Sequence, residues 1–217
     1  MALRKLFWFI FLIGSVWLLT ACGRGSLDSS TKSLELEPPS NQVGSSLPIQ
    51  SKPSESVALA YDPGDGSLDM ANRDGLSRWQ VGSGWEKINF PNELSLSGVI
   101  INPDQPATIF VSGPGLGVLR SDDGGVTWKE DNEGLPSLEV TALALHSSRR
   151  DTLYIWVRDE GIFRTEDGGA SWKRVPDQGP PDVDVRGLTH STLPGSMNTG
   201  WLYAATPTGA YLSMDCF

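Results

Sequence analysis

The sequence predicts an all-β protein built from short strands in repeated units, and three observations lead to this prediction. A twelve-residue pattern occurs twice without a gap, at Gly117–Trp128 and Gly161–Trp172, with a spacing of 44 residues. Short apolar runs precede both copies at matching intervals. The 217 residues include 24 Gly, 15 Pro and 8 Trp, a composition that suits short strands joined by many tight turns.

Two weaker copies extend the pattern to four units. The glycines that begin the four copies are Gly75, Gly117, Gly161 and Gly209. A second apolar run begins about nine residues before each glycine, and a first run lies before that one. The four first runs are Val57–Tyr61, Val99–Ile101, Thr141–Leu145 and Val185–Thr189. Each unit therefore predicts four antiparallel strands.

Repeats of 42–48 residues with four short strands are typical of β-propeller blades. The predicted blades cover about residues 56–90, 96–131, 140–176 and 185–217. The fourth copy reaches Phe217 within its last turn, so we expect an incomplete last blade. Four blades are also the lower limit for a closed ring. The sequence thus predicts an open or partial propeller.

The two clear copies end in the same turn motif, S/T-x-D-x-G-x-T/S-W. An aspartate can accept hydrogen bonds from turn amides, a glycine can adopt positive φ, and a tryptophan can bury a large ring between sheets. Hydroxyl residues can connect the two strands. The motif residues are Ser121, Asp123, Gly125, Thr127 and Trp128 in one copy, and Thr165, Asp167, Gly169, Ser171 and Trp172 in the other.

These residues resemble the Asp-box (BNR-type) repeats of sialidases, sortilin-like propellers, xyloglucan-cleaving propellers and photosystem II assembly factors. The resemblance implies that the box is a structural hairpin on the face away from any active site, so no catalytic residue is assigned to it. The other two copies depart from the motif. Trp79 and Gln80 occupy the Ser and Asp positions of the first copy, and Cys216 and Phe217 replace the two glycines of the fourth.

Residues 1–22 read as an export segment. Arg4 and Lys5 precede the apolar run Leu6–Leu19, which is too short for a comfortable membrane span. The run ends in Leu19-Thr20-Ala21-Cys22, which resembles the lipobox of bacterial lipoproteins. The resemblance implies that Cys22 is acylated and becomes the mature N-terminus; an uncleaved signal anchor is the alternative. We therefore expect a membrane-anchored lipoprotein, extracytoplasmic and located in the cell envelope.

Residues 23–55 contain nine Ser and four Pro and no aromatic residue. Such a segment cannot bury enough apolar area to offset its ordering entropy, so we predict a flexible tether. The whole chain has a net charge of −9, and loss of Arg4 and Lys5 with the export segment makes it −11. A chain this acidic repels phosphate backbones, so nucleic acid is not an expected partner.

Candidates for chemistry are few. His146 and His190 fall near the ends of first strands, where Asp62 and Asn102 lie in earlier units. This recurrence favours a hydrogen-bonding role in a turn over a metal site, and neither a metal nor a cofactor is predicted. Arg120 and Arg164 repeat with the scaffold. No nucleophile elbow, phosphate loop or dinucleotide motif is present.

The sequence therefore favours a non-catalytic binding or assembly module that is lipid-anchored through Cys22, although enzyme status stays open. A protein or a glycan is the expected ligand. Self-association through the incomplete last blade is a further expectation. The alternative function is a carbohydrate-active, sialidase-like hydrolase, which a ring of convergent acids and arginines at the blade centre would favour.

Overall fold

The computed structural model describes residues 56–90, 95–176, 179–180, 184–193 and 200–214. All of them belong to the compact unit Ser46–Phe217. The described residues form strands and turns and contain no helix, which confirms the all-β prediction. The predicted export segment with Cys22, the tether 23–55 and Cys216 lie outside the described residues. The domain boundaries therefore stay predictions.

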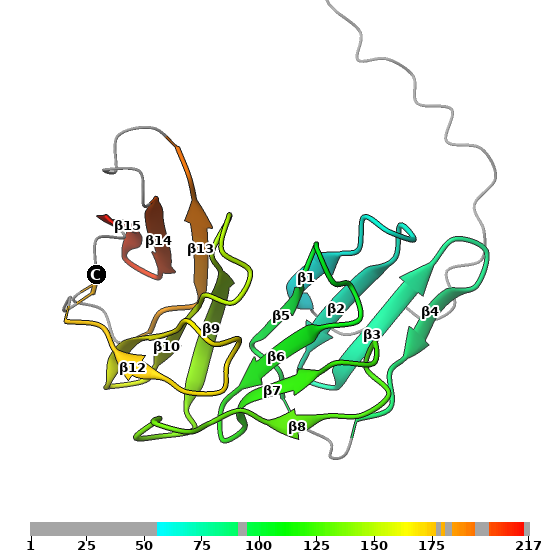
Figure 1. Cartoon of the computed structure of the whole chain (residues 1–217), viewed down its shortest axis with the longest axis horizontal. Coiled ribbons are helices and arrows are strands. Elements are labelled where there is room, and N and C mark those ends of the chain that lie inside the picture. The colour runs from blue at the N-terminus through cyan, green and yellow to red at the C-terminus, as the bar shows by residue number, and fades with distance from the viewer. Residues whose placement is uncertain (1–55, 91–94, 177–178, 181–183, 194–199, 215–217) are drawn as a thin grey trace, which may run out of the picture. The chain divides into compact units, whose positions relative to one another are not determined.

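The described strands form four antiparallel sheets, each made of consecutive strands (Figure 1). We call the sheets blades 1 to 4. Blade 1 contains β1 (Ser56–Tyr61), β2 (Leu68–Asn72), β3 (Gly75–Gln80) and β4 (Gly84–Lys87). Blade 2 contains β5 (Gly98–Ile101), β6 (Ile109–Gly113), β7 (Gly117–Ser121) and β8 (Lys129–Glu130). Blade 3 contains β9 (Val140–Leu145), β10 (Leu153–Val157), β11 (Gly161–Thr165) and β12 (Lys173–Arg174). Blade 4 contains β13 (Gly187–Ser191), β14 (Trp201–Thr206) and β15 (Gly209–Met214).

Backbone conformation explains why a glycine recurs at the start of each third strand. Gly117 and Gly161 begin the third strand of their blades with φ of 71° and 96°, and Gly75 and Gly209 do the same with φ of 114° and 150°. A side chain at these angles would be strained, because L-residues rarely adopt positive φ. The glycine therefore fixes the tight turn between the second and third strands of every blade.

The core lies between the sheets. One apolar cluster joins blades 1 and 2, a second joins blades 2 and 3, and a third joins blades 3 and 4. Alternation along β6 illustrates the arrangement, since Val111 packs toward blade 1 and Phe110 toward blade 3. Both faces of blades 2 and 3 are thus covered, and their second strands, β6 and β10, are entirely buried, whereas their short outer strands β8 and β12 are exposed.

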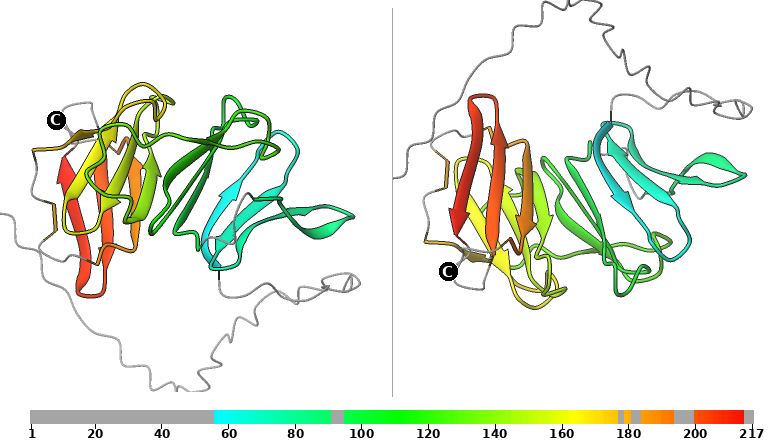
Figure 2. Two further views of the ribbon diagram at one scale, coloured as in Figure 1. Left: turned by 90° about the horizontal axis from the view of Figure 1, so that it is seen from below. Right: turned by 90° about the horizontal axis from the view of Figure 1, so that it is seen from above.

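The four blades form an open propeller, as predicted, in which the sheets follow one another along an arc (Figure 2). The outward faces of blades 1 and 4 are not covered by another described sheet. Val57, Leu59 and Tyr61 of β1 are 47%, 56% and 61% exposed, and Leu212 of β15 is 54% exposed. An open arc therefore leaves apolar side chains in contact with solvent at both of its ends.

Candidate functional site: the groove between the first strands

The first strands of the four blades line a groove with a volume of about 560 Å³. Each of these strands is the edge strand of its own sheet. Hydrophobic clusters hold neighbouring blades together and so fix the first strands side by side. The groove is lined by residues 57–61, 97–101, 103, 142–145 and 186–190.

Most residues that line the groove are aliphatic, although Val99, Ile101, Ala142 and Ala144 are buried in the core clusters between blades. Val57, Leu59 and Tyr61 project from β1 at one wall, while Arg186 and His190 lie at the β13 wall. The lining residues include no Asp or Glu. Hydrolysis of a glycosidic bond by the common mechanism needs two carboxyl groups across the scissile bond. The described lining therefore lacks the two carboxyl groups that this common mechanism requires.

The β1 wall also offers main-chain groups. Among the described strands β1 pairs only with β2, through partners from Ser56↔Asn72 to Tyr61↔Leu68. An edge strand of this kind exposes N–H and C=O groups that a further strand can use. The groove thus combines a strand edge with alternating exposed apolar side chains.

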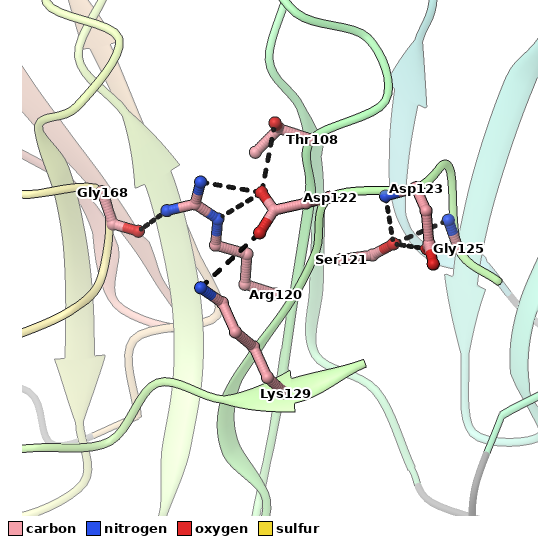
Figure 3. Close-up of polar contacts among 8 residues, drawn as sticks. All are labelled: Thr108, Arg120, Ser121, Asp122, Asp123, Gly125, Lys129 and Gly168. Atoms are coloured by element: carbon pink, nitrogen blue, oxygen red, sulfur yellow. Dashed lines mark hydrogen bonds and ion pairs between the residues drawn. The ribbon is translucent and has the colours of Figure 1, made fainter. Parts of the chain in front are cut away.

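The ten predicted motif residues lie elsewhere, in two turns that we call the aspartate turns, Ser121–Trp128 and Thr165–Trp172. In the first turn Ser121 Oγ accepts hydrogen bonds from the amides of Asp123 (3.3 Å) and Gly125 (2.8 Å) and donates to Asp123 Oδ1 (2.8 Å) (Figure 3). Asp123 Oδ1 also accepts from the Thr127 amide at 2.8 Å, and Oδ2 accepts from Thr127 Oγ1 at 2.5 Å.

The second turn repeats these bonds. Thr165 Oγ1 donates to Asp167 Oδ1 at 2.6 Å and accepts from the Gly169 amide at 3.0 Å. Asp167 accepts from the Ser171 amide at 2.9 Å and from Ser171 Oγ at 2.6 Å. Asp167 and Ser171 also line a smaller cavity of about 200 Å³ at the edge of blade 3, together with Arg164, Lys173 and Arg174.

These hydrogen bonds set the ionisation of both aspartates. Donation from the Thr127 side chain, followed by the Thr127 amide and Ser121, lowers the pKa of Asp123 to about 2. Donation from the Ser171 and Thr165 side chains lowers the pKa of Asp167 to about 2. Hydrogen bonds to a carboxylate favour its charged form. Each aspartate is thus held as an anion by its own turn and does not line the groove.

Arginines before the third hairpins of blades 1 and 2 each contact the next blade. Arg78 Nη1 donates to the Gly124 carbonyl at 3.2 Å, and Arg120 Nη1 donates to the Gly168 carbonyl at 2.9 Å. Arg120 also contacts Asp122, which in turn lies 3.6 Å from Lys129 Nζ (Figure 3). Of the two arginines that were predicted to repeat with the scaffold, Arg120 contacts the next blade, whereas Arg164 is ion-paired with Glu166 of its own blade.

The two motif tryptophans are used differently. Trp172 is 3% exposed, packs in the cluster between blades 2 and 3, and donates from Nε1 to the Asp131 carbonyl at 2.8 Å. Trp128 is only partly buried, lies 5.0 Å from the Phe90 ring, and donates to the Gly125 carbonyl within its own turn. Only Trp172 makes a polar contact to the preceding blade.

The two histidines correct one prediction. His146 occupies the predicted turn position: its Nδ1 accepts the Ser148 amide, as Asp62 and Asn102 accept the amides of Gly64 and Asp104. His190 does not. It lies within β13, paired with Leu202, and its Nδ1 accepts the Ser147 amide of blade 3 at 3.1 Å. The sequence places it near the strand end, but strand alternation directs its side chain across the blade junction.

In the described part of the chain, no group of three His, Cys, Asp or Glu side chains is placed to hold a metal ion. That part also contains no helix long and apolar enough to span a membrane. Sequence reasoning did not identify the groove itself. The one sequence feature that indicated the groove was the alternation of Val57, Leu59 and Tyr61 along the first apolar run.

Comparisons with known proteins support the fold alone. No family model matches the sequence, and no curated protein matches it. Three solved structures are similar: an ancestral GH74 enzyme (18% identity, TM-score 0.52), the GH74 enzyme of Niastella koreensis (17%, 0.53) and a nidogen/laminin complex (16%, 0.54). They cover 72%, 73% and 72% of this chain, which spans 22%, 29% and 64% of theirs. The chain therefore shares a propeller fold with proteins of different kinds and spans less than two thirds of each.

Proposed function

We propose that this chain is a non-catalytic binding or assembly module that holds an extended apolar segment of a partner protein in the groove between the first strands. The observation that carries the proposal is the lining, which presents aliphatic side chains and a strand edge without any carboxylate. An added strand gains main-chain hydrogen bonds from such an edge and side-chain selectivity from alternating positions.

A protein segment fits this groove better than a glycan. Apart from the imidazole of His190, Tyr61 is the one aromatic side chain among the described lining residues, whereas the walls are rich in Val, Leu, Ile and Ala. Aliphatic walls gain most from burying apolar side chains, at about 25 cal/mol per Å². The binding test described below distinguishes this function from the alternative, a carbohydrate-active hydrolase. A shared fold does not transfer the activity of the GH74 enzymes.

We further propose that the two aspartate turns are Asp boxes of the BNR type and that their role is to stabilise the third hairpin. The matching hydrogen bonds in both turns and the placement of all ten motif residues outside the groove support this role. The turns therefore hold the blades in shape while the first strands do the binding.

The proposed location is the cell envelope, outside the cytoplasm, with the domain anchored by lipid on Cys22. The support is the lipobox-like ending after a basic start and a short apolar run. Acyl chains stabilise anchoring by about 0.8 kcal/mol for each buried methylene. Mass spectrometry of the purified protein tests the anchor. We expect an acylated Cys22 at the N-terminus; an intact Met1, or a Cys22→Ser variant that still fractionates with membranes at an unchanged mature mass, contradicts it.

The groove is tested with a fluorescein-labelled octapeptide of alternating Val and Thr, measured by fluorescence anisotropy with the chain from Gly23 onward. We expect saturable binding that Leu59→Ser weakens about tenfold, because burying a leucine contributes roughly 1.5 kcal/mol. Val126→Ser is the matched control, since Val126 is 77% exposed and lies in an aspartate turn.

Two further probes decide between the functions. A peptide with proline at alternate positions cannot donate the same main-chain hydrogen bonds and should bind poorly. A xyloglucan oligosaccharide should neither bind nor be cleaved. Equal binding of both peptides would rule out main-chain pairing with the strand edge, and cleavage of the oligosaccharide would favour the hydrolase.

A further inference from the structure

Neighbouring blades pack face to face in one repeating order. Blade 1 contacts blade 2 through the face that carries Ala71 and Leu76, and blade 3 contacts blade 4 through the face that carries Trp156 and Ile162. Side chains on the opposite faces of blades 1 and 4 point away from the arc, because neighbouring residues of a strand alternate between its two faces. No other described sheet covers these two faces at the ends of the arc (Figure 2). We call them the blade 1 end face and the blade 4 end face.

A row of large side chains crosses the blade 1 end face. The strand registers align one residue from each strand of the blade, in the order Tyr61, Leu68, Trp79 and Trp85. These residues lie opposite Leu76 and Arg78, which face blade 2. Tyr61 is 61% exposed, and the other three residues are partly buried. The end face therefore presents two indoles and a phenol without a described sheet against them.

The blade 4 end face is also apolar and aromatic. Tyr203 pairs with Leu212, and Trp201 lies two residues away on the same side of β14. Leu202 and Ala204, which alternate with them, pack toward blade 3. Leu212 is 54% exposed, and Trp201 and Tyr203 are partly buried. The described strands of blade 4 contain no Asp, Glu, Lys or Arg, so no charge of these types opposes an apolar contact on this face.

The two end faces depart from the repeat in matching ways. At two junctions inside the arc, the fourth residue of the third strand is an arginine, Arg78 or Arg120, which donates to a carbonyl in the turn of the next blade. Blade 4 has Leu212 at this position. Blade 1 has Trp79 where the aspartate turns have a hydroxyl residue. The arginine is thus absent at one end of the arc and the aspartate turn at the other, and apolar side chains replace both.

We propose that two copies of this chain pair head to tail, with the blade 4 end face of each copy on the blade 1 end face of the other. Each new junction continues the order in which blade 1 meets blade 2 and blade 3 meets blade 4. A head-to-tail interface forms a closed ring when its rotation returns to the first copy. Two copies give eight blades, which is within the range of four to eight that propellers use.

A second copy fits these faces because each face lacks what the other would otherwise contact. Leu212 has no guanidinium that needs a carbonyl, and the indoles of Trp79 and Trp85 offer it apolar area. Large aromatic side chains of this kind provide much of the binding energy at protein interfaces. The ring also places β1 of one copy beside β13 of the other and so encloses the groove. That consequence for binding rests on the proposed function, whereas the pairing rests on the end faces alone.

Sedimentation equilibrium of the full chain, in a detergent matched to the density of the solvent, measures the protein mass. We expect the mass of one chain at low concentration and a plateau at two chains. Leu212→Glu should raise the dissociation constant about tenfold or more, because its carboxylate would lose water against the indoles. Val126→Glu adds the same charge in an aspartate turn, where Val126 is 77% exposed, and should not change it.

Mixing two variants tests which faces meet. Trp79→Lys alone should weaken the dimer as Leu212→Glu does. An equal mixture of the two should restore dimers, because one junction is then unaltered and the other pairs a lysine with a glutamate. A mass of one chain at every concentration, growth beyond two chains without a plateau, or a mixture no stronger than its components overturns the proposal.

Hydroxyl-radical footprinting of the wild-type chain does not depend on the folding of a variant. We expect oxidation of Trp79, Trp85 and Trp201 to fall several-fold between the concentration that gives one chain and the concentration that gives two. Trp128 is the matched control, since it is partly buried in an aspartate turn away from both end faces. Equal oxidation of Trp79 and Trp201 at the two concentrations overturns the proposal.

Discussion

The blades form similar antiparallel sheets, but different contacts stabilise the turns between their strands. The third hairpins of blades 1 and 3 show the contrast most clearly. In blade 3 the turn Thr165–Trp172 is held by the side chains of Thr165, Asp167 and Ser171. In blade 1 β3 continues through Gln80, which pairs with Gly84, and the turn relies on positive φ at Gly82 and Gly84. The aspartate turn is therefore not needed to form the hairpin.

The aspartate turn also positions the tryptophan at its end. The ring of Trp172 fills the space between blades 2 and 3, and its amide and Nε1 donate to the carbonyls of Glu133 and Asp131. In blade 1 Trp85 instead pairs with Trp79 across the hairpin and stays partly exposed. This difference predicts that a motif residue contributes most to stability where it connects two blades.

The largest effect is expected from Trp172→Ala. Removing this side chain leaves a cavity between two sheets and an unpaired Asp131 carbonyl, so we expect unfolding to be easier by about 4 kcal/mol. Trp128→Ala, at the same motif position but partly exposed, should cost about half as much. Urea unfolding of both variants is the measurement. Equal losses would mean that the interblade contact adds nothing to the burial of the ring.

A second comparison concerns the arginines of blades 1 and 2. Arg78 binds Asp69 through two contacts of 2.7 and 2.8 Å, and the Asp69 side chain is fully buried. This partner raises the pKa of Arg78. Arg120 occupies the equivalent position but lies 5.6 Å above the Phe110 ring and pairs with the exposed Asp122. The same residue thus compensates a buried charge in one blade and covers a ring in the next.

We therefore expect Arg78→Met to lower the free energy of unfolding by about 3 kcal/mol, because it leaves the Asp69 carboxylate buried without its partner. Arg120→Met should cost about 1 kcal/mol. The double variant D69L/R78M should recover most of the loss, since two apolar groups can replace a buried ion pair. A double variant as unstable as Arg78→Met alone would show that the pair does more than compensate its own burial.

The predictability of each feature follows from its range along the chain. The glycine that begins each third strand and the hydroxyl and acid of each aspartate turn act within a few residues, so their pattern identified the fold. The groove is different, because it brings together strands about forty residues apart and has no polar signature. His190 could not be assigned either, since its partner Ser147 lies 43 residues away.

The aspartate turns should also determine acid sensitivity. Asp167 has a folded-state pKa of about 2, below the value of about 3.9 in an unfolded chain. Its contribution to stability is therefore present above pH 4 and is lost as the pH falls toward 2. Asp167 is largely exposed, so screening by solvent limits the effect to about 1 kcal/mol. Urea midpoints between pH 2 and pH 5 should fall less steeply for Asp167→Asn than for the wild type.

Burial, and to a smaller extent the charge of Asp167, raises the pKa of Asp131, so Asp131 contributes with the opposite sign and its contribution also differs between the variant and the wild type. Asp123→Ala and Asp167→Ala should both destabilise the chain at neutral pH while leaving peptide binding by the folded protein unchanged. Loss of binding with an unchanged melting temperature would mean that the turns belong to the binding site.

The smallest effect is expected at the two ends of the arc, where blades 1 and 4 lack the cover that blades 2 and 3 have. Val57, Leu59 and Tyr61 on one face and Leu212 on the other are about half exposed, and such faces favour association. Light scattering of the chain from Gly23 onward should therefore show an apparent mass that rises with concentration. Leu59→Ser with Tyr61→Ser should reduce the rise, whereas Val126→Ser should not. A mass that stays at that of one chain at every concentration would contradict the idea, and it would mean that the exposed faces of the arc do not drive association.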